Sequence, residues 1–156
     1  MATLFVVIGM PGSGKSCYIR NELRPLCAEG VCAEDYMAES HKNASRFGAS
    51  RYYESLIQAL KDSKNCAIAD IEYCRIKKRK EIEEIVRGEV QGVEIKWYYF
   101  ENDPAKCEEN VNCRENRSNR QKSKERNKIC ELKKIYVIPP DADKIIPVWS
   151  PNKGVK

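Results

Sequence analysis

The feature that most constrains this chain is the segment GMPGSGKS at positions 9–16, which fits the pattern G-x-x-x-x-G-K-[ST]. An unbroken apolar run at positions 4–8 precedes it, as in a central parallel strand buried on both faces. After it, Ile19, Leu23 and Leu26 recur at the spacing of one helix face. The segment therefore lies between a buried strand and a helix start, which favours a phosphate-binding loop over an ordinary glycine turn that ends in Lys-Ser.

The chemistry of such a loop is local. Glycines let the backbone curl so that successive N–H groups point at phosphate oxygens, and the following helix adds the positive end of its dipole. We expect Lys15 to bridge the β- and γ-phosphates and the Ser16 hydroxyl to ligate Mg²⁺. The expected nucleotide-binding residues are Gly9, Pro11, Gly12, Ser13, Gly14, Lys15, Ser16 and Cys17.

Length and composition indicate one globular domain over residues 1–150, followed by a loose tail at 151–156. The net charge of +5 is compatible with anionic substrates but does not require them. The eight cysteines show no C-x-x-C spacing, and the apolar N-terminus has no basic leader, so we expect reduced thiols in a cytoplasmic protein. No apolar run is long enough to cross a bilayer, and no obligate protein partner is inferred.

Strand and helix patterns alternate along the chain, which predicts an α/β three-layer sandwich with a mostly parallel, five-stranded sheet. The five strands are expected at 4–8, 31–33, 66–70, 93–100 and 144–149, with Pro147 placing the last one at an edge. The first helix is expected to end near Gly30, a second helix to span about 50–64, and another to begin at Asn102–Pro104.

A basic helix is expected to begin near Arg75, with Ile82, Ile85 and Val86 facing inward. We interpret its first charges as a solvated face, namely Arg75, Lys77, Lys78, Arg79 and Lys80.

Acidic residues follow two of the predicted strands at the edge where an open α/β sheet binds its ligands. Asp70 follows the third strand, and we expect it to be the second anchor of Mg²⁺. Asp35 or Glu34 follows the second strand and could take the proton from an attacking hydroxyl as general base. The alternative for either site is that the carboxylate only caps the next helix. His41, the only histidine, is interpreted as a solvated bystander.

Three arginines recur at every third position, Arg114, Arg117 and Arg120, and on a helix they would share one side. Phosphoryl transfer needs cations on the phosphate oxygens, so we expect Arg114 and Arg117 to be catalytic, carried by a lid at about 112–127. The opposing interpretation is a solvated basic helix, because lysines continue the charge up to Lys134.

In its form G-x-P-G-S-G-K-S, the loop resembles that of P-loop kinases with the nucleoside-monophosphate-kinase-like fold, above all the kinase domain of 5′-polynucleotide kinases. Glu34-Asp35-Tyr36 resembles the Asp-Asp-Tyr-Arg block of that family, which carries the hydroxyl-activating acid. CAIADIE at 66–72 resembles its strand ending in Asp-Thr-Asn, and 114–117 its arginine-bearing lid. The resemblance also implies an adenine-binding loop near 139–147.

The departures from that pattern concern the acceptor. Glu34 stands where the first acid is expected, Met37 replaces a substrate-binding arginine, and Ile71 and Glu72 replace Thr-Asn. The expected function is therefore an ATP-dependent phosphotransferase that moves the γ-phosphate to a hydroxyl of a nucleotide, polynucleotide or other small molecule, with ATP and Mg²⁺ as cofactors. The alternative is a nucleotide- or RNA-binding module with little or no turnover, in which the basic run holds phosphates of a polymer.

Overall fold

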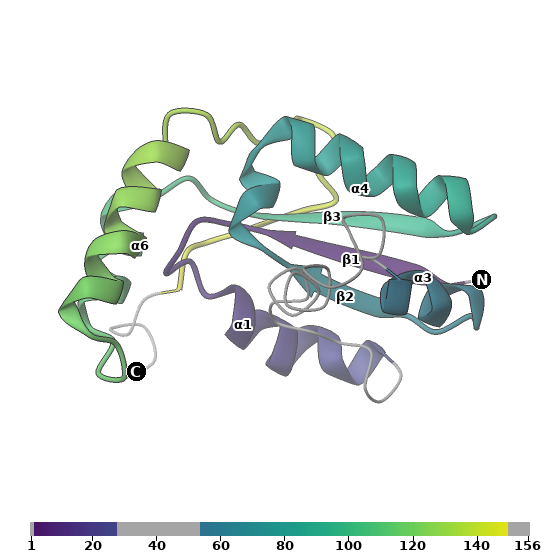
Figure 1. The fold of residues 1–156 in the computed structure, drawn as a ribbon, viewed down its shortest axis with the longest axis horizontal. Coiled ribbons are helices and arrows are strands. Elements are labelled where there is room, and N and C mark those ends of the chain that lie inside the picture. The colour runs from purple at the N-terminus through teal and green to yellow at the C-terminus, as the bar shows by residue number, and fades with distance from the viewer. Residues whose placement is uncertain (1, 28–53, 150–156) are drawn as a thin grey trace.

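The structure is a computed structural model that describes residues 2–27 and 54–149, and Figure 1 shows its fold. Its sheet contains β1 (Thr3–Ile8), β2 (Cys66–Ala69), β3 (Glu94–Phe100) and β4 (Lys144–Ile146). The described strands are all parallel and lie in the order β2-β1-β3-β4. The apolar run that precedes the loop therefore forms an inner strand, as its unbroken hydrophobicity predicts.

The helical elements follow the strands in the expected alternation. α1 (Lys15–Tyr18) continues without a break into a wider turn, η1 (Ile19–Leu23), and a tighter one, η2 (Arg24–Leu26). The later elements are α3 (Glu54–Lys61), η4 (Ile71–Cys74), α4 (Ile76–Glu89), α5 (Pro104–Asn112) and α6 (Asn119–Leu132).

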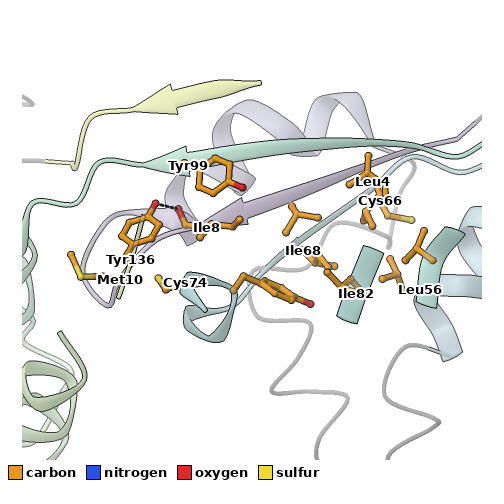
Figure 2. Close-up of a cluster of buried hydrophobic side chains, with 14 of the residues drawn as sticks. Leu4, Ile8, Met10, Leu56, Cys66, Ile68, Cys74, Ile82, Tyr99 and Tyr136 are labelled. Atoms are coloured by element: carbon orange, nitrogen blue, oxygen red, sulfur yellow. Dashed lines mark hydrogen bonds between the residues drawn. The ribbon is translucent and has the colours of Figure 1, made fainter. Parts of the chain in front are cut away.

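Side chains of β1 alternate between two apolar clusters, one on each face of the sheet. Leu4, Val6 and Ile8 pack with residues of α3, α4, α5 and α6, and Figure 2 shows part of this cluster. Phe5 and Val7 pack on the other face with residues of the α1–η1 helix. The two clusters confirm the predicted helix–sheet–helix layers and the parallel α/β class.

The β1 arrow in Figure 1 points toward the side of the molecule where α6 lies, and the chain passes there from β1 into α1. Tyr136 joins strand ends at this side, because its hydroxyl lies between the carbonyl oxygens of Ile8, at 3.3 Å, and Phe100. Burial raises the pKa of Tyr136, so the phenol stays protonated and keeps its donor. The dashed line in Figure 2 marks the bond to Ile8.

Several expected boundaries need correction. The first helix ends at Leu26 rather than near Gly30, because η2 contains Pro25 and Cys27 is extended. Leu26 is exposed rather than buried, since the wide turn of η1 shifts the residues that follow it off the inward face. The last strand ends at Ile146 instead of Trp149, and it lies at an edge of the described sheet, as Pro147 predicts.

The interpretation of Arg79 as part of a solvated face is wrong. Its side chain is buried and donates to the carbonyl oxygens of Tyr73 (2.7 Å), Cys74 (3.0 Å) and Val137 (3.3 Å). The guanidinium also lies 5.2 Å from the ring centre of Tyr99. Arg79 occupies the same stripe of α4 as Ile82 and Val86, which is why it faces inward.

Two further predictions concern strands and membranes. The predicted strand at 31–33 lies outside the described residues. The other four predicted strands correspond to β1, β2, β3 and β4. Among the described helices, none has the length and apolar character needed to span a bilayer.

Candidate phosphate-binding site

The loop between β1 and α1 has the backbone geometry that its glycines allow. Gly12 and Gly14 adopt φ values of 83° and 103°, in the left-handed region that side chains disfavour. A Cβ on Gly12 would lie 2.4 Å from the carbonyl oxygen of Cys107, so the loop also packs directly on α5. These two glycines are therefore needed for the shape of the loop and for its support.

Carbonyl groups of the loop are bonded to other parts of the protein. Lys15 Nζ donates to the carbonyl oxygens of Gly9 at 2.9 Å and Met10 at 3.0 Å. Asn110 Nδ2 donates to the carbonyl of Gly12 at 2.8 Å. Two backbone N–H groups complete the set, Trp149 to Ser13 at 3.1 Å and Tyr18 to Gly14 at 3.0 Å.

This bonding leaves N–H groups for a ligand. In a trans peptide the N–H points away from the carbonyl of the same plane, so the N–H groups of Gly14 and Lys15 face the opposite side from the bonded carbonyls. Ser16 and Cys17 follow in the first turn of the helix, where N–H groups have no intrahelical acceptor. None of these four N–H groups has a backbone acceptor within the described residues. The arrangement can take up an anion such as a phosphate chain.

Lys15 is a cation that belongs to the loop itself, with its backbone N–H in this set. Its partial burial lowers the pKa of its ammonium group, and the nearby charge of Arg114 lowers it further. The carboxylate of Asp70 acts in the other direction, as the thiols of Cys74 and Cys107 would only if they were ionised. Burial raises the pKa of these thiols, to about 12 for Cys74 and about 11 for Cys107, so both stay neutral at physiological pH. Lys15 is thus a poorly solvated ammonium that a polyphosphate would stabilise.

Asp70 lies directly after β2, the strand that pairs with β1 through Ala69 and Val7. Its Oδ1 accepts the backbone N–H of Glu72 at 2.7 Å, so the carboxylate caps η4. Asp70 also interacts electrostatically with Lys15. Asp70 therefore caps η4, and its expected role as a magnesium anchor stays a prediction.

The arginines differ from the prediction in their local structure. Arg114 and Arg117 lie in the connection between α5 and α6 rather than on a helix, and only Arg120 is helical. Both connection arginines pair with Glu125 of α6, Arg114 at 2.9 Å and Arg117 at 3.4 Å. The helix break follows from Ser118, which caps α6 and forms a capping box with its third residue.

Of the two connection arginines, Arg114 is the one whose charge lowers the pKa of Lys15. Sequence reasoning missed Glu125, which holds Arg114 and Arg117 together. A carboxylate flanked on both sides by cations, Lys124 and Arg126, was the available signal.

Ser13 and Asn110 show how the loop is supported. Ser13 is buried, and a Cβ on Gly9 would lie 2.4 Å from its Oγ, so this hydroxyl points into the protein, while the backbone N–H of Ser13 donates to the carbonyl of Met10 at 3.1 Å. Asn110 was also missed by the sequence analysis. Its signal was a polar residue in the apolar stripe of α5 formed with Cys107 and Val111.

The roles expected for the acids after the second predicted strand stay predictions. Asp35, Glu34, Met37 and His41 lie outside the described residues. Over 2–27 and 54–149, no three or more His, Cys, Asp or Glu side chains gather into a metal-binding group, and the seven described cysteines are free thiols. A hollow on the surface of α4 is lined by Ile76, Lys77, Lys80, Glu81 and Glu84 and includes no loop residue.

The parallel sheet and the glycine loop between β1 and α1 define a P-loop nucleotide-binding protein. A family model described as "AAA domain" matches residues 4–137. The chain therefore belongs to this family. The match confirms the predicted resemblance to P-loop kinases.

Comparison with solved structures finds a likeness to the crystal structure of a fungal RNA kinase. The two chains are 16% identical with a TM-score of 0.48, and the match covers 93% of this chain and 73% of the other. RNA kinase activity is a property of that protein. A search of curated protein sequences gave no match.

Proposed function

We propose that this chain is an ATP-dependent phosphotransferase that transfers the γ-phosphate of ATP to a hydroxyl group. The observation that carries the proposal is the loop between β1 and α1, whose carbonyls are bonded within the protein while its N–H groups face the ligand side. Such a loop recognises the phosphates of a nucleotide, and the poorly solvated Lys15 gives those phosphates a cation.

The donor set near the loop fits a magnesium–nucleotide complex. When bound, Mg²⁺ would neutralise charge on the β- and γ-phosphates. The hydroxyl of Ser16 and the carboxylate of Asp70 are the groups that would hold it, directly or through water. Asp70 supports this role because it follows the strand next to β1 and acts electrostatically on Lys15.

The remaining roles are assigned by charge and position. Lys15 holds the phosphate chain, and Arg114 and Arg117 stabilise charge on the transferred group from a lid at about 112–127. The pairing of both arginines with Glu125 supports this role, since one carboxylate fixes two guanidinium groups side by side. Asp35, with Glu34 as the alternative, takes the proton of the acceptor hydroxyl.

The acceptor that we propose is a nucleotide, a polynucleotide or another small molecule with a free hydroxyl. A second candidate function is a nucleotide- or RNA-binding module with little or no turnover. The cations of α6 favour it, because Arg120, Lys122, Lys124, Arg126 and Lys128 outnumber the two carboxylates of that helix, Glu125 and Glu131. Such a surface would hold the phosphates of a polymer in a salt-dependent way.

Incubation with γ-labelled ATP, Mg²⁺ and a panel of nucleosides, oligonucleotides and hydroxylated metabolites separates the two functions. Transfer of label to an acceptor, lost in Lys15→Met, supports the phosphotransferase. Retention of RNA that weakens steeply with salt, without label transfer to any acceptor, supports the binding module. Absence of both nucleotide binding and transfer contradicts the proposed function.

A further inference from the structure

Asn110 is a buried amide whose hydrogen-bonding capacity is spent on the loop and on the segment after β4. Its side-chain nitrogen donates to the carbonyl oxygens of Gly12 at 2.8 Å and Trp149 at 2.6 Å. An amide nitrogen carries two hydrogens, so these two bonds use both of them. The neighbours of Asn110 on α5 are apolar and fully buried, Cys107 and Val111. A buried polar group in such surroundings stabilises the structure only when it is bonded.

Trp149 supplies a second bond to the same part of the loop. Its backbone N–H donates to the carbonyl of Ser13 at 3.1 Å, while its own carbonyl accepts from Asn110. Two successive carbonyls of the loop, those of Gly12 and Ser13, are therefore held by elements far away in the sequence. The Trp149 side chain takes no part in these bonds, since only backbone atoms of this residue are involved.

We propose that Asn110, together with the backbone of Trp149, is the positioning element of the phosphate site. We call these two groups the carbonyl clamp. The Ser13 carbonyl and the Gly14 N–H belong to the same trans peptide and point in opposite directions. Because the clamp fixes the direction of this carbonyl, it also directs the N–H of Gly14 to the opposite side, where a phosphate oxygen would lie. The bond to Gly12 fixes the preceding plane, so the loop is arranged for an anion before the anion arrives.

This inference rests on the proposed function of the loop, and it adds a specific dependence to it. The affinity of the site for a bare phosphate chain is set by Asn110, which does not itself touch the ligand. A residue that only supports packing would lower the melting temperature of the protein without changing the affinity of the molecules that remain folded.

Inorganic tripolyphosphate is the probe, because it contacts the phosphate site and carries no base. Calorimetric titration of the full chain is expected to give about tenfold weaker binding for Asn110→Ala than for the original protein, because the variant loses the buried hydrogen bond that the amide makes to the loop carbonyl of Gly12. Asn102→Ala is the control, since the Asn102 amide also donates to two backbone carbonyls, those of Lys133 and Tyr136, neither of which belongs to the loop. Its affinity for tripolyphosphate should be unchanged.

If Asn110→Ala does not fold, Asn110→Ser keeps one donor in a smaller side chain and is expected to bind tripolyphosphate with reduced affinity. Equal affinities for the original protein and a folded Asn110 variant overturn the clamp while leaving the proposed function intact. Failure of the original protein itself to bind tripolyphosphate contradicts the proposed function instead.

A second pair of variants tests the other half of the clamp. Trp149→Pro removes the N–H that bonds to Ser13, whereas Trp149→Ala keeps it, and both remove the indole. Tripolyphosphate should bind more weakly to Trp149→Pro than to Trp149→Ala. Indistinguishable affinities for these two variants would show that the backbone of Trp149 does not position the loop.

Discussion

Replacing Gly12 by alanine is the change that most sharply tests the shape of the loop. Gly12 has a φ of 83°, which an L-residue adopts only with strain. The added Cβ would lie 2.4 Å from the carbonyl oxygen of Cys107 and 3.1 Å from Cγ2 of Val111. The Cys107 oxygen belongs to the backbone of α5, so the overlap cannot be relieved by turning a side chain.

The expected loss of stability follows from these two costs. The left-handed conformation costs an alanine about 1–2 kcal/mol more than a glycine. Relieving the overlap requires the loop and α5 to separate, and overpacking of this kind costs about 1–3 kcal/mol. The sum is roughly 2–5 kcal/mol, a large fraction of the stability of an ordinary domain, which is about 5–15 kcal/mol.

Urea denaturation followed by circular dichroism measures this loss, and Gly88→Ala is the control. Gly88 lies in α4, and a Cβ there meets no atom within 4 Å, so alanine should stabilise the helix by about 0.5–1 kcal/mol. The two substitutions add the same methyl group and are expected to act in opposite directions. A Gly12→Ala protein within about 0.5 kcal/mol of the original, the ordinary range for surface substitutions, would refute the described packing of the loop on α5.

Three further predictions follow from the groups around the loop. Asp70→Asn should keep the cap of η4, because an amide oxygen can also accept the Glu72 N–H. The substitution should nevertheless weaken the dependence of ATP binding on Mg²⁺. If Mg²⁺ titrations of ATP binding are the same for the variant and the original protein, Asp70 is not part of the metal site. Arg79→Lys should lower the free energy of unfolding by about 2–3 kcal/mol, because an ammonium group cannot donate to all three backbone carbonyls that the guanidinium reaches. An unchanged midpoint of urea unfolding would argue against these hydrogen bonds. Because burial lowers the pKa of Lys15, this side chain binds fewer protons in the folded chain than in the unfolded chain at alkaline pH below 10.5, so its own contribution to stability should rise with pH there, whereas the buried thiols of Cys74 and Cys107 contribute in the opposite direction. In urea melts across that range, the slope of the unfolding free energy against pH should be more negative in Lys15→Met than in the original protein, and identical slopes would contradict the assigned burial.

The parts of the fold that the sequence predicts are those that local patterns determine. The apolar run of β1, the glycines of the loop and the amphipathic stripe of α4 act over a few residues, and each is found where its pattern places it. Pro104 begins α5 and Asp103 caps it, again from local chemistry.

The groups that support the site were missed because their partners are distant in the sequence. Asn110 bonds to a loop carbonyl 98 positions away, and Tyr136 to the end of β1 across 128 positions. Arg79 looked like one more cation of a basic run, although its spacing with Ile82 on α4 already placed it on the buried stripe. Polar residues within apolar stripes were the signal in two of these cases, and their partners could not be named without the structure.

The central claim is that backbone N–H groups between β1 and α1 hold a chain of phosphates. Amide chemical shifts of the ¹⁵N-labelled protein, recorded during titration with inorganic tripolyphosphate, test it most directly. We predict that the signals of Gly14, Lys15, Ser16 and Cys17 shift strongly and saturate together, while that of Gly88 on α4 stays in place. A folded protein in which these four signals remain unchanged at saturating tripolyphosphate would contradict the claim.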